Sequence, residues 1–207
     1  MSSKIFELPT ERAVAALSAA FLVDEEFQRT FWSEDRMDAP RARPFFRAQV
    51  SGSEAFRAPA LGVGSESAPE GVITYHATHR GVAWNPMVTL RLLYVLSVYV
   101  RRIPSPVRSR VNHYSKWIYA NVPKGPHFFI TALGVPTAFR GRGHSAALIA
   151  EVVSRSQADG KSKGVGISTF TRTRADLYEK QGFRPTNHVS QDGLEAWVLF
   201  LDHGTSS

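Results

Sequence analysis

The sequence predicts an α/β protein, because apolar strands and amphipathic helices alternate along its second half. Residues 127–135 carry no charged side chain, which is typical of a buried strand, and the apolar residues of 146–159 recur at helical spacing. A short apolar strand at 164–170 and a helix at 174–181 follow. Residues 183–201 predict a closing hairpin, whose turn contains an Asp-Gly pair.

The turn between the first of these strands and its helix is rich in glycine and arginine. It contains Arg140, Gly141, Arg142 and Gly143. The first N–H groups of a helix have no partner within it, and the helix dipole adds partial positive charge there. Glycine permits positive φ and a close approach of the backbone to a ligand. The turn is therefore a candidate phosphate or pyrophosphate site, with an ordinary strand-to-helix turn as the alternative that the glycines alone leave open.

Two segments resemble the GNAT superfamily of N-acetyltransferases. Residues 140–145, Arg-Gly-Arg-Gly-His-Ser, are similar to its R/Q-x-x-G-x-G/A signature, which holds the pyrophosphate of acetyl-CoA, although Ser145 stands where the family has Gly or Ala. Residues 177–183, Leu-Tyr-Glu-Lys-Gln-Gly-Phe, are similar to the family segment that carries a tyrosine near the CoA sulfur. The resemblance implies the GNAT fold, a central mixed β-sheet flanked by helices, with acetyl-CoA as co-substrate and no metal.

The resemblance also implies which residues form the site. Tyr178 is the implied catalytic residue, because a phenol in reach of the sulfur can protonate the departing thiolate; a core tyrosine is the structural alternative. Thr171 stands where family members often have Asn. Backbone N–H groups at the end of the strand are expected to polarise the thioester carbonyl. The implied acetyl-CoA-binding residues are Leu133, Gly134, Val135, Arg140, Gly141, Arg142, Gly143, His144, Ser145 and Thr171.

No general base is evident from the sequence. Several GNAT enzymes carry a carboxylate on the strand before the phosphate loop, and Phe129 occupies that position here. His127, Glu195, Asp192 or a water chain could accept the proton of the amine, unless the amine arrives already neutral.

A helical insertion is expected at residues 86–125, ahead of the acetyl-CoA-binding core at 127–183. Its first helix, 87–102, is apolar on nearly all sides, which favours packing in the core over a seat on a membrane surface. A hairpin formed by 72–77 and 81–85, the insertion and the strand after it resemble the puromycin N-acetyltransferase-like branch of the GNAT proteins.

We expect the whole chain, residues 1–207, to form a single domain with its core at about 10–202. Helices are predicted at 11–21 and 41–50. Residues 51–70 are rich in Gly, Ser, Ala and Pro and are expected to form a flexible loop.

A short acidic segment follows the first helix and allows two interpretations. It is either a solvated loop that Phe27, Phe31 and Trp32 anchor in the core, or a set of carboxylates that lines the acceptor side and attracts a cationic amine. Its acidic residues are Asp24, Glu25, Glu26, Glu34, Asp35 and Asp38.

The charge distribution suits a polyanionic ligand. The net charge is +7, and residues 71–150 contain no Asp or Glu. This favours CoA, but nucleic acid or an anionic membrane would also fit. There is no cysteine, which excludes thiolate catalysis and disulfides. Residues 13–23 are apolar, but the charges before them sum to zero, so they predict a first helix rather than a signal peptide, and a cytoplasmic protein.

The sequence therefore predicts an acetyl-CoA-dependent N-acetyltransferase that acts on a primary amine of a small molecule, such as an antibiotic or another metabolite, or of a peptide. A catalytically weak GNAT-fold protein that senses acyl-CoA is the main alternative, and a nucleic-acid binder is a third. The expected partners are acetyl-CoA and an amine acceptor, with no nucleic acid and no membrane span. The protein is expected to be a monomer or a homodimer.

Overall fold

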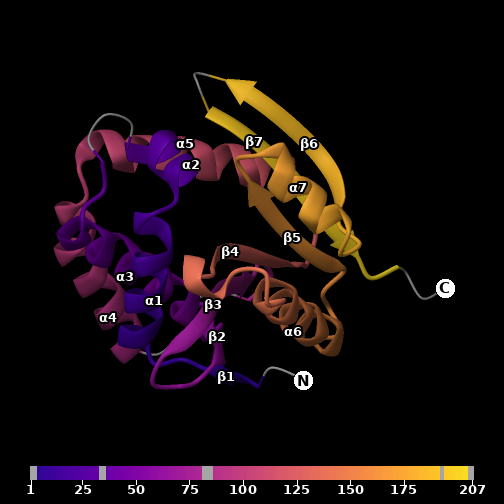
Figure 1. Ribbon diagram of the computed structural model, residues 1–207, viewed down its shortest axis with the longest axis horizontal. Coiled ribbons are helices and arrows are strands. Elements are labelled where there is room, and N and C mark those ends of the chain that lie inside the picture. Colours follow the sequence, from indigo (N-terminus) through magenta and orange to yellow (C-terminus); the bar gives the residue numbers. More distant parts are fainter. Residues whose placement is uncertain (1–3, 33–35, 81–85, 192–193, 205–207) are drawn as a thin grey trace.

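A mixed β-sheet forms the centre of the protein (Figure 1). The computed structural model describes residues 4–32, 36–80, 86–191 and 194–204. Its seven strands lie in the order β1-β2-β3-β4-β5-β7-β6, and of the neighbouring pairs only β4 and β5 are parallel. The strands are β1 Ile5–Glu7, β2 Leu61–Gly64, β3 Pro69–Ala77, β4 Phe128–Gly134, β5 Gly164–Thr169, β6 Arg184–Gln191 and β7 Leu194–Asp202.

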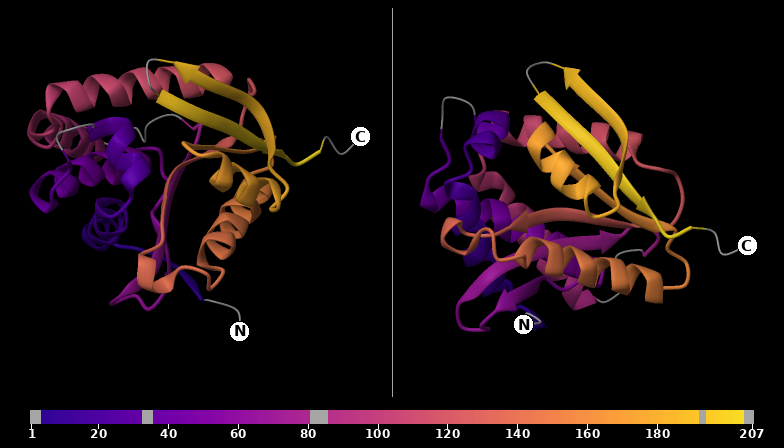
Figure 2. Two further views of the ribbon diagram at one scale, coloured as in Figure 1. Left: turned by 45° about the horizontal axis from the view of Figure 1, so that its top comes forward. Right: turned by 45° about the vertical axis from the view of Figure 1, so that its right-hand side comes forward.

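Helices cover both faces of this sheet (Figure 2). On one face α1 and α3 pack against β3 and α5 packs against β7, while α6 and α7 cover the other face. The helices are α1 Thr10–Leu22, α2 Glu25–Phe27, α3 Ala39–Ala55, α4 Pro86–Val98, α5 Ser105–Asn121, α6 His144–Ala158 and α7 Arg172–Glu179. Three short turns complete the chain: the π-helical η1 Gln28–Trp32 and the 3₁₀ turns η2 Val100–Arg102 and η3 Thr137–Phe139.

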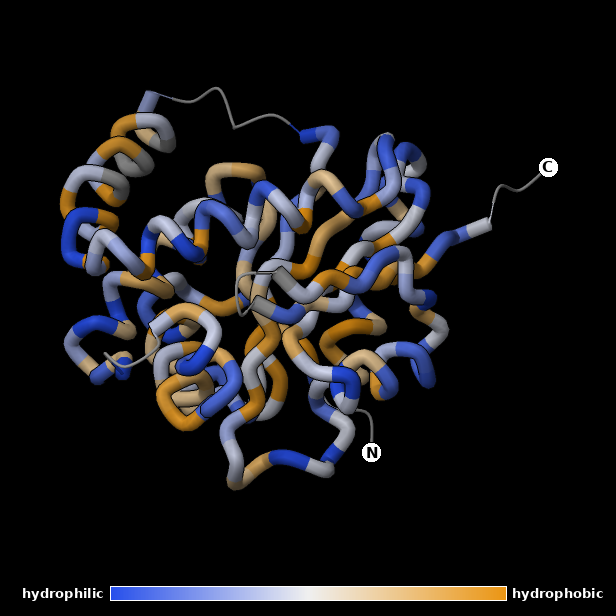
Figure 3. The backbone as a smooth tube through the Cα atoms, turned by 90° about the horizontal axis from the view of Figure 1, so that it is seen from above, coloured by the Kyte–Doolittle hydropathy of each residue, from blue (hydrophilic) through white to orange (hydrophobic). Residues whose placement is uncertain are grey.

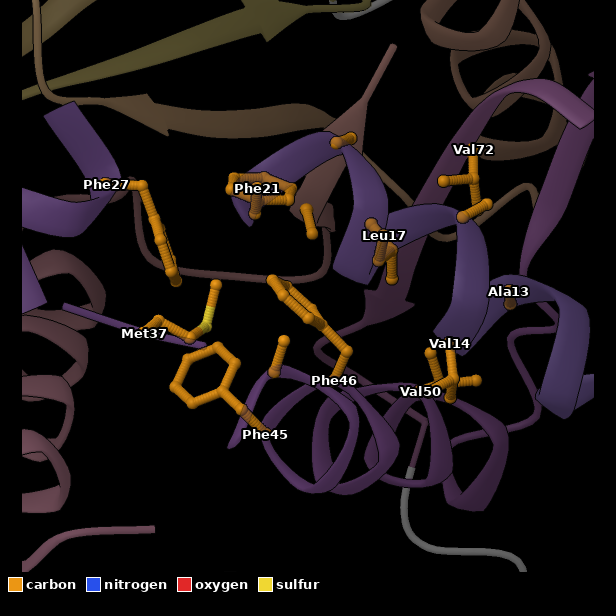
Figure 4. Close-up of a cluster of buried hydrophobic side chains, with 14 of the residues drawn as sticks. Ala13, Val14, Leu17, Phe21, Phe27, Met37, Phe45, Phe46, Val50 and Val72 are labelled. Atoms are coloured by element: carbon orange, nitrogen blue, oxygen red, sulfur yellow. The ribbon is translucent and has the colours of Figure 1, made fainter. Parts of the chain in front are cut away.

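An aromatic cluster fills the first of these faces (Figure 4). Phe21 of α1, Phe27 of α2 and Phe46 of α3 are buried, and the ring centroids of Phe21 and Phe46 lie 5.1 Å apart. Phe31 and Trp32 are buried as well, so the aromatic residues of the acidic segment are core anchors, as one interpretation of the sequence expected.

The alternating pattern of the second half confirms the predicted α/β class with a mixed sheet. Helix α6 ends at Ala158, one residue before the expected Asp159, and α7 is followed by Gly182 with a φ of 93°. Positive φ at the end of a helix favours glycine. The closing hairpin is formed by β6 and β7, and its predicted turn at 192–193 lies outside the described residues.

The N-terminal half differs from the sequence-based prediction in two segments. Residues 51–70 are not one loop, because 51–55 complete α3 and 61–64 form β2. Strand β3 pairs with β2 and β4, so it needs no partner at 81–85, which lie outside the described residues. Helix α3 begins before the expected residue 41 because Asp38 caps it, and its Oδ1 accepts a hydrogen bond from Arg41 N at 3.0 Å.

Helix α4 is not packed in the core, which corrects the prediction from its apolar sequence. Met87, Leu90, Leu93 and Tyr94 are each more than half exposed, and only Val95 is buried among the side chains described for this helix. The helix lies at the edge of the molecule, where its neighbours are α3 and η2 (Figure 3). An all-round apolar helix is usually buried, but here the sheet is already covered by α1, α3 and α5.

Helix α6 is tied down at both ends: its start contacts β3, and the residue after its end contacts the turn that follows β3. At its start, His144 Nε2 lies 2.7 Å from Glu70 Oε2. Just past its end, Asp159 contacts His79 Nε2 at 2.7 Å and Arg80 Nη2 at 2.5 Å. Burial alone would raise the pKa of Asp159, but these two basic partners outweigh it and lower that pKa. The N-terminus of α6 is therefore fixed relative to the sheet.

Candidate active site

Strands β4 and β5 separate halfway along their length. They pair only from Phe128 with Val165 to Ile130 with Ile167, and residues 131–134 of β4 continue without β5. At the same point a bulge interrupts the pairing of β4 with β3, and Thr131 is its extra residue. The backbone edge of β4 that faces β5 is thus left without a strand partner from residue 131 onward.

The loop between β4 and α6 exposes backbone rather than side chain. Gly141 and Gly143 have φ of 79° and 80°, and a Cβ built on either one meets no atom within 4 Å. The first helical hydrogen bond of α6 runs from Ala147 N to Gly143 O. The amides of residues 144–146 therefore precede it and are available to a ligand. Open space beside free amides and two left-handed glycines is a cradle that suits phosphate oxygens.

Charged side chains around this loop are mostly basic. Arg140 is exposed, and its Nε donates to Val135 O at 3.3 Å. The Arg142 guanidinium lies 5.2 Å from the centroid of the Phe139 ring. Glu70 is the acidic neighbour, 2.7 Å from His144 Nε2 and 3.9 Å from Arg142 Nη1. The predicted residues 140–145 are thus brought together in one positively charged loop, with one carboxylate beside it.

A cavity of about 720 Å³ opens where β4 and β5 separate. Its wall is formed from both faces of the sheet, since α5 of one face and α7 of the other both contribute residues to it. Its described wall contains no Asp, Glu, Lys or His, and its charged residues are Arg108 and Arg174. The aromatic side chains of the wall are Phe21, Phe27, Phe31, Phe45, Phe46, Tyr114, Tyr119, Phe129, Phe170 and Tyr178.

Tyr178 lines this cavity from α7, the helix that begins directly after β5. Burial raises the pKa of its phenol to about 12, while Arg174 opposes this rise and Asp24 reinforces it. The phenol is therefore protonated at neutral pH and can donate a proton. The ring also packs near Phe183, with 6.2 Å between the ring centroids, so the helix orientation is fixed by core contacts.

Three aromatic rings from distant parts of the chain meet in the cavity wall. Phe31 of η1, Tyr114 of α5 and Phe170, the residue after β5, have ring centroids 5.2–5.4 Å apart. Burial raises the pKa of the Tyr114 phenol. The nearby Ser168 hydroxyl opposes this rise, although it is not placed to form a hydrogen bond with Tyr114 Oη, and Tyr178 adds to the rise.

Three buried polar atoms of wall residues have no hydrogen-bond partner in the described part of the chain. These atoms are Tyr114 Oη, Thr169 Oγ1 and Arg108 Nε, and all three are inaccessible to solvent. Native proteins satisfy almost all such atoms. These three atoms make the wall more polar than its many aromatic rings suggest.

The remaining predicted residues take different positions. Leu133 lines the cavity, whereas Gly134 packs against α1, and a Cβ on it would lie 2.9 Å from Ala20 Cβ. Val135 supplies the carbonyl that Arg140 contacts. Thr171 caps α7, since its Oγ1 accepts from Arg174 N at 3.4 Å, and its own O–H is left to donate.

None of the described candidates for a general base lines the cavity. His127 Nδ1 lies 2.9 Å from Gly125 O, just before β4 and away from the point where the strands separate. Glu195 lies 3.2 Å from His188 Nε2 on the outer hairpin. Asp192 lies outside the described residues.

The acidic segment does not supply acceptor-side carboxylates either. Asp24 and Glu26 form ion pairs with Arg174, and Asp38 caps α3. Glu34 and Asp35 lie outside the described residues, and no other acidic residue of the segment lines the cavity in the part that the structure describes. The carboxylates tie the N-terminal segment to α7 instead.

Sequence reasoning missed the residues that form the acceptor wall. The sequence alone assigns no role in acceptor binding to these residues, which are Phe31, Arg108, Tyr114 and Phe170. Their meeting depends on contacts between η1, α5 and β5. One usable signal existed, because the α5 residues that line the cavity include Arg108, Val111, Asn112 and Ser115, which share one helix face.

Solved structures of N-acetyltransferases share this fold over nearly their whole length. A histone acetyltransferase HPA2 and related acetyltransferase from Corynebacterium glutamicum is 16% identical and matches with a TM-score of 0.65, with 100% of each chain covered. Arylalkylamine N-acetyltransferase 2 from Aedes aegypti is 11% identical, with a TM-score of 0.68 and 99% and 100% coverage. Arabidopsis thaliana NAA60 in complex with acetyl-CoA is 15% identical, with a TM-score of 0.56 and 97% and 99% coverage.

These likenesses establish the fold as that of the GNAT N-acetyltransferases. No family model matches the chain, and no curated protein matches it in sequence. The described helices include none that is both long and apolar enough to cross a membrane.

Proposed function

We propose that this protein is an acetyl-CoA-dependent N-acetyltransferase that acts on a primary amine. One arrangement carries the proposal: the glycine loop at the start of α6 leads to the gap between β4 and β5, and this gap opens onto a cavity that contains Tyr178. A loop that suits phosphate, a gap between strands and a cavity with a phenol follow one another in the order that an acyl-CoA and its acceptor would require, which supports the proposal.

The loop and the gap fit acetyl-CoA. The amides of residues 144–146 and the basic side chains of Arg140 and Arg142 would hold the pyrophosphate, and the unpaired edge of β4 from residue 131 would hold the pantetheine arm and polarise the carbonyl. Bound acetyl-CoA supplies an activated acyl group: the amine nitrogen forms a bond to the carbonyl carbon as the carbon–sulfur bond breaks.

Tyr178 supplies the proton for the leaving sulfur. Its phenol stays protonated at neutral pH because burial raises its pKa to about 12. It donates that proton to the thiolate and recovers one from the amine, which loses a proton as it becomes an amide. The products are the N-acetyl amide and the free thiol of CoA, so the enzyme returns to its starting state.

The wall of the cavity favours a neutral amine without a dedicated base. Burial disfavours the ammonium form, and Arg108, the arginine of the wall that forms no ion pair among the described residues, disfavours it further. The described wall holds no carboxylate that could pair directly with the ammonium group. An amine that enters the cavity would therefore release its proton on binding, which accounts for the missing base.

Other parts of the proposal rest on the sequence alone. These are the likeness to the puromycin N-acetyltransferase-like branch, the nature of the acceptor as an antibiotic, another metabolite or a peptide, the cytoplasmic location, and the monomeric or homodimeric state. A catalytically weak sensor of acyl-CoA is the second candidate function, favoured by the absence of a base from the described wall.

Thiol release from acetyl-CoA in the presence of primary amines tests the proposal. We expect amine-dependent release, and Tyr178→Phe should lower kcat by about 100-fold while the Kd of acetyl-CoA stays within about twofold. Tyr75→Phe is the matched control, since Tyr75 is a buried tyrosine of raised pKa that lies outside the cavity wall. Equal loss in both variants, or loss of acetyl-CoA affinity in Tyr178→Phe, would make Tyr178 a structural residue and favour the sensor.

A further inference from the structure

The two arginines of the cavity wall differ in their partners. Arg174 Nη2 lies 2.7 Å from Asp24 Oδ2 and 3.4 Å from Glu26 Oε2, so its charge is balanced by the protein. Arg108 forms no ion pair, hydrogen bond or ring contact within the described residues, although its Nε is buried. A buried guanidinium nitrogen without a partner is costly. The wall therefore carries one positive charge that the protein leaves unbalanced.

Arg108 lies at a distance from the reacting groups. It precedes Tyr114 by six residues on α5, and a rise of 1.5 Å per residue places their Cα atoms about 9 Å apart along the helix axis. The Tyr114 ring contacts Phe170, the residue after β5, and Tyr178 is close enough to raise the pKa of the Tyr114 phenol. Tyr114 therefore lies at the end of the cavity where β5 ends. The Cα of Arg108 therefore lies toward the other end, in the first turn of α5, where Ser105 also lines the wall.

Aromatic and aliphatic side chains fill the space between these two ends. Phe31 and Val111 lie in the same wall, and Phe31 makes an edge contact with Tyr114 at 5.3 Å between ring centroids. Such a wall favours an apolar or aromatic ligand body. It disfavours a polyamine or a guanidinium-bearing amine, because a second cation would face Arg108 with no carboxylate in the described wall.

We propose that the acceptor is a primary amine with an aromatic or apolar body and an anionic group at its far end, a carboxylate or a phosphate, which Arg108 binds. The amine lies beside Tyr178 and the anionic group lies roughly one aromatic ring and a short linker away, which separates this class from α-amino acids. The inference rests on the proposed acetyl transfer and names its substrate class.

Matched acceptors test this assignment. We would measure kcat/KM by thiol release at saturating acetyl-CoA for 4-(2-aminoethyl)benzoate, its neutral amide 4-(2-aminoethyl)benzamide, tyramine O-phosphate and agmatine. We expect the anionic amines to exceed the benzamide by about 10-fold or more, since hydrogen bonds to charged groups contribute about 1.5–3 kcal/mol each. The ratio of benzoate to phosphate identifies the anionic group.

Two variants separate the role of Arg108 from general charge. Arg108→Gln should lower kcat/KM for the preferred anionic amine by about 10- to 100-fold and leave the benzamide within about twofold. Lys116→Gln removes one positive charge from an exposed position of the same helix that lies outside the wall, and it should preserve the preference. A wild-type enzyme that uses benzamide or agmatine as well as the anionic amines would overturn the inference, as would equal losses for all acceptors in Arg108→Gln.

Binding of 4-ethylbenzoate, which has no amine, distinguishes failure of the inference from failure of the proposed function. We would titrate it by calorimetry into the protein with CoA present. Binding to the wild type that Arg108→Gln weakens, combined with no turnover of any amine, would uphold the anion site and reject acetyl transfer. Acetylation of neutral or cationic amines without 4-ethylbenzoate binding would uphold acetyl transfer and reject the anion site.

Discussion

The loop at residues 140–145 and the cavity wall formed by α1, η1, α3 and α5 present different parts of the chain to a ligand. The loop offers backbone amides, and its two left-handed glycines leave the space beside them empty. The wall offers side chains, chiefly aromatic rings from segments that are far apart in the sequence. A backbone site depends on conformation and tolerates side-chain changes around it, whereas a side-chain site depends on the identity of each residue.

Acid should lower the free energy of unfolding through a partly buried histidine on the acceptor side. His76 of β3 packs against Phe129 and Tyr119, both in the wall. Burial, with a smaller effect of His127, lowers the pKa of His76 from 6.5 to about 4. The unfolded state therefore binds more protons between these values, so the free energy of unfolding should fall as the pH drops from about 6.5 to 4, by about 2–3 kcal/mol from this residue.

Urea unfolding at a series of pH values measures this effect. His76→Gln should have a shallower pH dependence below pH 6.5, while the exposed His188→Gln should keep the slope of the wild type. Identical slopes in His76→Gln and wild type would show that His76 does not carry the linkage.

A conservative change of the wall should affect the acceptor alone. Phe31→Leu replaces the Phe31 ring, which packs against Tyr114 and Phe170, with a smaller aliphatic side chain. We expect the KM of an aromatic amine to rise by about 10-fold, because aromatic contacts contribute about 0.5–1.5 kcal/mol beyond area. Calorimetry should find the Kd of acetyl-CoA unchanged; an increase of that Kd equal to the increase of KM would mean that the two regions are not independent.

The side-chain charges of the loop should contribute less to the binding of acetyl-CoA than its backbone amides do. Arg142 is exposed and lies beside the open glycines. We expect Arg142→Gln to raise the Kd of acetyl-CoA by about 2- to 5-fold, since an exposed ionic contact contributes about 0.2–1 kcal/mol. Raising the salt concentration should shrink the difference. A loss of 100-fold or more would place the binding energy in the side chains.

Removal of the carboxylate beside the loop should have the smallest effect, of opposite sign. Glu70→Gln takes a negative charge away from His144 and Arg142. Acetyl-CoA should then bind about two- to threefold more tightly, within the range for exposed charges. Glu66→Gln, an exposed acid in the preceding turn, serves as the control. Weaker binding in Glu70→Gln would mean that Glu70 orients His144 for the ligand.

The sequence predicted the loop side because that side is local. The strand before Arg140, the glycines at 141 and 143 and the helix to Ala158 are contiguous, so periodicity and turn chemistry were sufficient to place them. The same holds for Tyr178, whose helix directly follows β5.

The acceptor side could not be predicted in this way. Its wall depends on how α5 lies against η1 and β7. The sequence can show that Arg108 and Val111 share a helix face, but it cannot show what that face meets. Asp24 and Glu26 illustrate the difficulty, since their charge suggested an amine site while the fold pairs them with Arg174. Helix α4 is a further case, because its composition indicates burial and only its position reveals the exposure of Leu90 and Leu93.

A calorimetric titration with acetyl-CoA tests the central claim most directly, on wild type, Gly143→Glu, Gly143→Ala and Gly160→Glu. Gly160 is the matched control, because it has a φ of 70° and open space around it but follows the opposite end of α6. We predict saturable binding to wild type and Gly160→Glu, a modest loss in Gly143→Ala from backbone strain, and a loss of about 100-fold or more in Gly143→Glu, whose carboxylate would face the pyrophosphate. Undiminished binding to Gly143→Glu, or no binding to the wild type, would contradict an acetyl-CoA site at the start of α6.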